Sequence, residues 1–282
     1  MGRENEKELN KIVSSKKLDG NWPVEKILSI LESIKGVNAK IRSKKRLGKI
    51  LLVLGIIGIS IGVVVADNNS YSFLAWPLII IFLLIFLYGL FLYFTSRKKE
   101  FGDDFHTYLW PLLNDLKEDI DSKEVSVFFD LLPFFSKKFK KGSSRKYKHN
   151  SYTCKDYYYE RKLCSITIPL VDGNILSIDC KEFSIDFQRK RGKKEKHKYK
   201  RKFNFNLRLA FKPQKYKIKS LDLLNSQNIS FKEKGKRNII GIKFVQKEKG
   251  LNKYIALSHH LTLQNIIALY GSIMPVKSKG IN

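Results

Sequence analysis

The chain has 282 residues and carries 54 Lys and Arg against 26 Asp and Glu, a net charge of +28. An excess of this size is typical of proteins whose partner is rich in phosphate, either a nucleic acid or a membrane surface. The 43% apolar content excludes a disordered polycation. Three cysteines are too few for a disulfide-stapled fold.

The first 49 residues predict a cytosolic N-terminal region. Residues 1–17 are polar, and we expect them to be loose. A helix is predicted from Trp22-Pro23 to Gly36, with Val24, Ile27, Leu28, Leu31 and Ile34 on one face. A basic helix then leads from Val37 toward the next segment. The amphipathic helix either lies on a bilayer or packs on the C-terminal domain, and its mixed charges favour packing.

Two long uncharged segments follow, at residues 50–66 and 73–94. Crossing the hydrocarbon core of a bilayer takes about 20 helical residues, so the second segment is long enough and the first is at the short end. Six residues separate them. This spacing predicts a transmembrane hairpin over residues 50–94, whereas the alternative is a buried helix pair in a soluble protein. The first segment begins too far into the chain for a cleaved signal peptide.

The charges that flank these segments predict their orientation. Basic residues precede the first segment and follow the second, and the connecting loop 67–72 has no Lys or Arg. By the positive-inside rule, both termini lie in the cytoplasm of a multi-pass protein of the inner (plasma) membrane.

Small residues recur every four positions in the first segment, at Gly58, Gly62 and Ala66. Such a stripe allows a second helix to approach closely. We expect the partner to be the second segment of the same chain, with a homo-oligomer as the alternative. Neither segment contains Asp, Glu, Lys, Arg or His, which favours an anchor over a transporter.

Residues 95–136 predict an acidic helical segment and a first strand. Residues 97–136 hold 5 basic and 9 acidic side chains. A helix is expected over residues 101–120, divided by Pro111, with an apolar face formed by Phe105, Leu109, Leu112, Leu113 and Leu116. Residues 125–129 are typical of a strand.

Residues 137–282 hold 36 basic and 10 acidic side chains, a net charge of +26. Their alternating patterns predict a β-rich cytosolic domain with strands at 166–170, 175–187, 203–211 and 240–244. A two-residue turn is predicted at Asp172-Gly173. A change in apolar parity between Cys180 and Phe183 predicts a bulge or a bend. The end is helical, with Leu263, Ile266, Ile267 and Tyr270 on one face. The fold class is thus a transmembrane hairpin with a cytosolic α+β, mainly antiparallel β, domain.

The densest charge lies in residues 188–202, which we call the arm, with ten Lys or Arg and one Glu. Its even-numbered lysines share parity with Asn204, Asn206 and Arg208, while His197, Tyr199 and Arg201 share the parity of the phenylalanines that follow. An extended strand with a turn at Gly192 would present a row of ammonium groups. The alternative is a disordered charged loop. The candidate residues for an anionic partner are Arg189, Lys190, Arg191, Lys193, Lys194, Lys196, Lys198, Lys200, Lys202 and Arg208.

The sequence nominates no catalytic, cofactor or metal site. It has no P-loop, no dinucleotide-binding glycine motif after a strand and no H-E-x-x-H motif. Cys154, Cys164 and Cys180 lack the spacing of zinc ligands. His259 and His260 have no nearby Cys or carboxylate in the sequence. We therefore expect a protein that is not an enzyme.

Three segments carry a resemblance to a known group of proteins. They are VSVFFDLLPFF at Val125–Phe135, LVDGNILSIDC at Leu170–Cys180, and the Lys-rich run into Phe203–Phe211. With the order of the elements, this resembles bacterial membrane proteins of uncharacterised function, in which a short helix precedes a two-span hairpin and a cytosolic β-rich domain. The resemblance implies that architecture and no activity.

These observations predict a membrane anchor or scaffold whose basic domain binds an anionic partner at the inner membrane surface, either lipid headgroups or an acidic protein. The alternatives are a nucleic-acid-binding membrane protein and a non-catalytic subunit of a membrane enzyme or transport complex. Headgroups need the fewest assumptions, since the two segments would hold the domain next to them.

Overall fold

The structure is a computed structural model that describes residues 2–67, 72–121, 124–219, 229–250 and 257–276. The chain divides into two compact units. One, the helical unit, comprises residues 32–101, and the other, the sheet unit, comprises residues 1–31 and 102–282.

The helical unit is a hairpin of two long apolar helices, α2 (Val24–Ala66) and α3 (Ser72–Lys99). Both are long and apolar enough to cross a membrane, which on its own is weak evidence that they do. The predicted segments 50–66 and 73–94 lie within them, and residues 68–71 of the predicted loop lie outside the described residues. The predicted helix end at Gly36 is wrong, because α2 continues through this exposed position without interruption.

Glycines line the contact between α2 and α3. A Cβ atom at Gly58 would lie 2.1 Å from the ring of Phe82, and one at Gly62 would lie 2.6 Å from Ile79. The contact extends beyond the predicted stripe, since a Cβ at Gly55 would lie 2.9 Å from the Cα of Phe86. The two backbones therefore approach too closely for larger residues at these positions.

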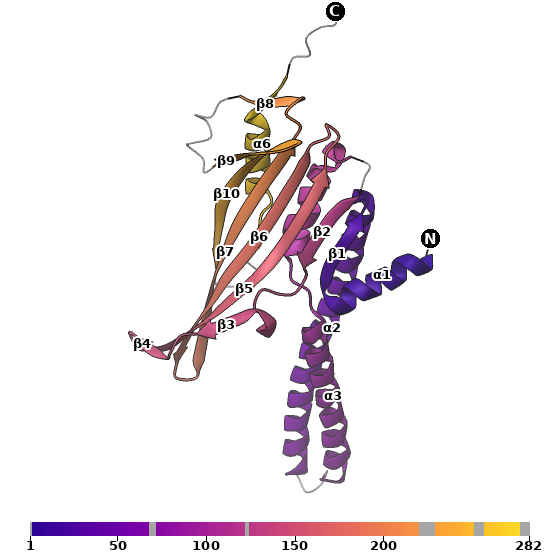
Figure 1. The fold of residues 1–282 in the computed structure, drawn as a ribbon. Helices are drawn as coiled ribbons and strands as arrows, with labels where there is room; N and C mark the ends of the chain where they lie inside the picture. Colours follow the sequence, from indigo (N-terminus) through magenta and orange to yellow (C-terminus); the bar gives the residue numbers. More distant parts are fainter. Residues whose placement is uncertain (1, 68–71, 122–123, 220–228, 251–256, 277–282) are drawn as a thin grey trace, which may run out of the picture. The chain divides into compact units, whose positions relative to one another are not determined.

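The sheet unit is built on an antiparallel sheet of nine strands in the described part of the chain, in the order β1-β2-β5-β6-β7-β10-β9, with β3 and β4 paired to β5. The strands are β1 (Lys17–Trp22), β2 (Val125–Asp130), β3 (Lys140–Ser143), β4 (Tyr147–His149), β5 (Tyr152–Pro169), β6 (Ile175–Arg191), β7 (Lys194–Phe211), β9 (Ile229–Lys234) and β10 (Arg237–Gly250). Two short strands, β8 (Tyr216–Ile218) and β11 (Ile273–Pro275), pair separately. Figure 1 shows β5, β6 and β7 extending together to the β6–β7 turn.

The N-terminus belongs to this unit. The expectation that residues 1–17 are loose is wrong, because α1 (Gly2–Ser15) is helical and β1 pairs with β2. Glu8 fixes α1 through the indole of Trp22 at 2.5 Å and the ammonium of Lys26 at 2.7 Å. At the start of α2, Ile27 and Leu31 are fully buried. This apolar face therefore packs on protein, as the mixed charges favoured.

One face of the sheet is buried under helices, and we call the other the open face. The predicted helix 101–120 consists of a π-helical turn η1 (Phe105–Leu109), α4 (Trp110–Asp115) and a 3₁₀ turn η2 (Lys117–Asp119), and its predicted apolar face is buried. The ring of Tyr108 packs on Phe205 at 5.6 Å. The C-terminal helix α6 (His260–Gly271) buries Thr262, Ile266 and Leu269, whereas Ile267 is 70% exposed, contrary to prediction.

Two irregularities differ from prediction. The β5–β6 connection, residues 170–174, is longer than the predicted two-residue turn. The amide of Leu170 donates to the carbonyl of Asn174 within it, and Gly173 has φ +84°, a value that glycine adopts without strain. No register shift interrupts β6 between Cys180 and Phe183. The bulge lies on β5 instead, between Lys162 and Cys164.

We expect Gly55→Leu to destabilise the helical unit, since its side chain would collide with the backbone of α3. Overpacking of this kind costs about 1–3 kcal/mol, and thermal unfolding in detergent, followed by circular dichroism, measures it. The matched control is Gly36→Ala, because a Cβ there meets nothing within 4 Å. This change should stabilise the helix by up to about 1 kcal/mol. Equal melting temperatures for the two variants would contradict the assigned packing.

Candidate functional site: the basic arm

The arm is an ordered β-hairpin. β6 and β7 pair without interruption from Ile175↔Ala210 to Arg191↔Lys194, and Gly192 in the turn has φ +56°. The predicted turn at Gly192 and the predicted backward extension of the strand through the lysines are both confirmed. The period of two therefore continues from the buried phenylalanines of β7 into the arm.

The structure places most of the candidate residues together on the open face. These are Arg189, Arg191, Lys194, Lys196, Lys198, Lys200, Lys202 and Arg208. Lys193 lies in the turn, and Lys190 points to the opposite face, where it stands opposite Glu195. Arg208 is set apart from the rest because its guanidinium forms an ion pair with Asp179 at 2.5 Å. The free positive charge is therefore concentrated on one side of the hairpin.

Like charges stand directly opposite each other on the open face. Between β5, β6, β7 and β10, the described registers contain five such cross-strand pairs: Lys162↔Lys181, Arg189↔Lys196, Arg191↔Lys194, Lys200↔Lys249 and Lys202↔Lys247. Like charges in this arrangement destabilise a sheet. On the other face the facing charges are of opposite sign, as in Arg161↔Glu182 and Arg201↔Glu248. The repulsion is thus confined to one surface.

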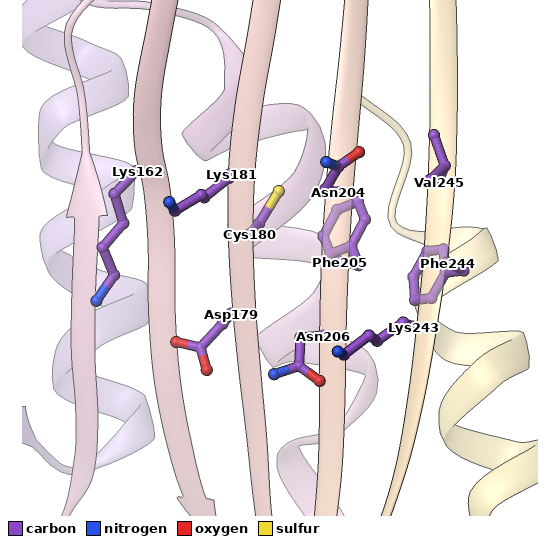
Figure 2. Close-up of a pocket in the computed structure, with 10 residues that line it drawn as sticks. All are labelled: Lys162, Asp179, Cys180, Lys181, Asn204, Phe205, Asn206, Lys243, Phe244 and Val245. Atoms are coloured by element: carbon purple, nitrogen blue, oxygen red, sulfur yellow. The ribbon is translucent and has the colours of Figure 1, made fainter. Parts of the chain in front are cut away.

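A depression of about 610 Å³ lies on the open face where the arm joins the sheet. Figure 2 shows Lys162, Lys181 and Lys243 on three strands around it, with Asn204 and Asn206 on β7 between them. Its volume is within the range of small-molecule sites. Its lining holds three lysines and one carboxylate, that of Asp179, and is therefore positive on balance.

Under the base of the arm, two arginines and two carboxylates form a buried ionic cluster. The Nη2 atoms of Arg161 and Arg201 lie 2.6 and 2.7 Å from Oδ2 of Asp104, and their Nε atoms each lie 2.6 Å from an oxygen of Glu182. All four side chains are at most 6% exposed. Ser184 donates a further hydrogen bond to Glu182. The cluster therefore ties β5, β6 and β7 to the segment that precedes η1.

The cluster favours the charged forms of Glu182 and Arg201. Burial alone would raise the pKa of Glu182, but the two guanidinium groups and the hydrogen bonds outweigh it and lower this pKa to about 2. Burial disfavours the charged form of Arg201 too, yet Asp104 and Glu182 raise its pKa above the usual value. Aromatic rings cover the Arg201 guanidinium, with Phe134 at 4.5 Å and Phe203 at 4.7 Å.

The sequence reasoning missed this cluster as a site. One signal was available, because Arg201 shares the parity of the buried phenylalanines, and a charged residue at an apolar position needs a buried counterion. Asp104 is remote in the chain, and nothing in its local pattern identifies it as that partner. Pairing Arg161 with Glu182 from the sequence would require the register of β5 against β6. The bulge between Lys162 and Cys164, which was not predicted, shifts that register by one residue.

The histidines and cysteines considered as metal ligands do not form a site in the described residues. His259 lies 3.0 Å from the carboxylate of Asp115, a neighbour that the sequence did not indicate. Within the described ranges, no three His, Cys, Asp or Glu side chains are grouped as metal ligands. Cys154, Cys164 and Cys180 are buried. The chemistry that the arm itself can perform is the binding of anions.

We expect Glu182→Gln to destabilise the sheet unit by about 3–5 kcal/mol, since it leaves buried guanidinium charge uncompensated. The wild-type contribution of Glu182 is complete above the unfolded pKa of about 4.5 and is lost as the pH falls toward about 2. Urea unfolding of the full chain in detergent at several pH values measures both effects.

The control for this experiment is Glu195→Gln, because the Glu195 side chain is 49% exposed. Its removal should change the unfolding free energy by less than about 1 kcal/mol. A Glu182→Gln protein as stable as this control at neutral pH would contradict the role assigned to the cluster.

Comparison of the chain with protein-family models, with curated proteins and with solved structures finds no match. The function proposed below therefore rests on the residues and geometry of the chain itself.

Proposed function

We propose that the chain is a membrane anchor or scaffold that is not an enzyme, with α2 and α3 crossing the inner membrane and both termini in the cytoplasm. In this proposal its arm binds the anionic headgroups of the membrane surface. An acidic protein is the other partner with the required charge.

The exposed surface of the helical unit supports the anchor. Large apolar side chains project from both helices, among them Val64 at 71% exposed, Trp76 at 68% and Phe91 at 63%. Exposed apolar area of this extent is unfavourable in water and favourable in lipid. The basic residues before residue 50 and after residue 96 support the orientation through the positive-inside rule.

The observation that carries the binding proposal is the set of like-charge pairs on the open face. Facing lysines and arginines lower the stability of the free sheet, whereas a phosphate placed between two of them would neutralise the repulsion. The opposite face shows that this chain also pairs strands through opposite charges, as in Lys190↔Glu195. The arrangement thus favours the state in which anions cover the open face.

Lipid headgroups are favoured among anions because of the covalent connection. The sheet unit resumes at Gly102, three residues after α3 ends at Lys99. In a membrane-anchored chain, the arm would remain close to a high concentration of headgroup phosphates. Each Lys near an anionic surface contributes about 1 kcal/mol.

We expect replacement of Lys194, Lys196 and Lys198 by Gln to weaken binding to anionic vesicles about 100-fold, from about 1 kcal/mol per Lys. The same variant should be as stable as the wild type or slightly more stable, because two like-charge pairs are removed. The full chain is held in neutral-lipid nanodiscs, and co-flotation with phosphatidylglycerol vesicles measures binding. Thermal unfolding measures stability.

The charge-matched control replaces Lys215, Lys217 and Lys219, which are exposed and lie away from the arm in and beside β8. It should retain vesicle binding. Equal binding of the wild type to neutral and anionic vesicles would refute the headgroup proposal, and equal losses in the two triple variants would refute the role of the arm.

A further inference from the structure

The polarity of β6 reverses where the strand enters the arm. Before this point Leu176 and Ile178 face the buried side of the sheet. Further along, Glu182, Ser184 and Asp186 occupy the buried positions. Phe183, Ile185 and Phe187 stand on the open face, where each is partly exposed. We call these three residues the apolar stripe.

Cations border the apolar stripe on its β7 side. Phe183, Ile185 and Phe187 stand opposite Lys202, Lys200 and Lys198 of β7, respectively. The ammonium of Lys200 lies 4.8 Å from the ring centroid of Phe187. On the β5 side the margin is mixed. Tyr158 stands opposite Ile185 and is 41% exposed, whereas Glu160 and Asp156 stand opposite Phe183 and Phe187, and Asp156 is buried and accepts a hydrogen bond from Tyr147. The open face next to the arm therefore combines an apolar centre on β6 with a basic margin on β7 and a mixed margin on β5.

The ionic cluster explains why β6 can place polar side chains on its buried side. It does not explain what the apolar stripe on the open face contacts. Glu182 satisfies two buried arginines, so a carboxylate on the buried side is compensated. Two phenylalanines and an isoleucine on the outer side have no such compensation in water, because their apolar area remains hydrated. A partner for this face must supply apolar surface as well as negative charge.

We infer that the open face of the arm and of the adjoining apolar stripe docks on an anionic bilayer, with the stripe inserted between lipid headgroups and the lysines of β7 on their phosphates. This inference rests on the proposed function and names the contact that it uses. Lysines with long apolar stems beside aromatic rings are typical of side chains at the bilayer interface. Ile185 offers no ring on which a base can stack, whereas Phe183 and Phe187 do. The choice of lipid over nucleic acid therefore rests on the covalent connection to α3, which keeps headgroups near.

The first experiment compares the wild type with Ile185→Ser/Phe187→Ser in the nanodisc co-flotation assay, at low and at high salt. Salt screens the lysines but not the buried apolar area. The wild type should retain binding to anionic vesicles at high salt, and the variant should bind about tenfold to 100-fold more weakly there, with a smaller loss at low salt. Phe187→Leu, which keeps an apolar side chain, is the control and should bind like the wild type.

A second measurement does not depend on the folding of the serine variant. A fluorophore is attached at Ile185→Cys or, on the opposite face of β6, at Gln188→Cys, while the native cysteines are buried. Nitroxide groups on the acyl chains of the anionic vesicles should quench the label at position 185 much more strongly than the label at position 188.

The outcomes separate this inference from the proposed function. Equal quenching at the two positions, or the same salt dependence in the wild type and the serine variant, would overturn the inserted stripe while leaving headgroup binding in place. Absence of any preference for anionic vesicles at low salt would refute the proposed function itself. Displacement of the vesicles by single-stranded RNA, with RNA binding lost in the serine variant, would assign the open face to nucleic acid and overturn the inference.

Discussion

The buried ion pairs of Arg161 and Arg201 with Asp104 and Glu182 determine how the arm is built. Each arginine bonds both carboxylates, so the four groups are satisfied together or not at all. A shift of one residue in the pairing of β5, β6 or β7 would move a charge of the cluster to the other face and leave its partners buried without a counterion. The cluster therefore specifies the register of the three strands that form the arm.

The polarity of the arm follows from this register. Because Glu182 must face the buried side, its neighbours Lys181 and Phe183 must face the open side, and the alternation then places Ile185 and Phe187 there as well. On β7, Arg201 in the cluster similarly directs the even-numbered lysines outward. One buried charge on each strand thus produces a surface that is both cationic and apolar.

The sequence predicted those parts of the fold that depend on local pattern. The uncharged helices, the turn at Gly192 and the strand through Phe203 and Phe211 each follow from spacing within one segment. The expected bulge near Cys180 was wrong for a physical reason: the parity of the apolar residues changes there, but the strand does not, because Glu182 takes the buried position. A glutamate at a buried position of β6 is explained only by its contacts with Arg161 and Arg201. Contacts between segments that are distant in the chain leave no signal in the local pattern.

In a protein that is anchored in the membrane, the arm does not need a high intrinsic affinity for its ligand. A site held by two helices within reach of its ligand experiences a high effective concentration, so contacts that would be weak between separate molecules are sufficient. Lysines suit this regime because each contributes about 1 kcal/mol at an anionic surface and responds to salt and lipid composition. In the proposed function the hairpin of α2 and α3 determines where the domain acts, and the arm makes a reversible contact there. In the proposed function the like-charge pairs follow from the same division of roles: the buried cluster fixes the register of the strands, and anions on the open face would relieve the repulsion between its lysines and arginines.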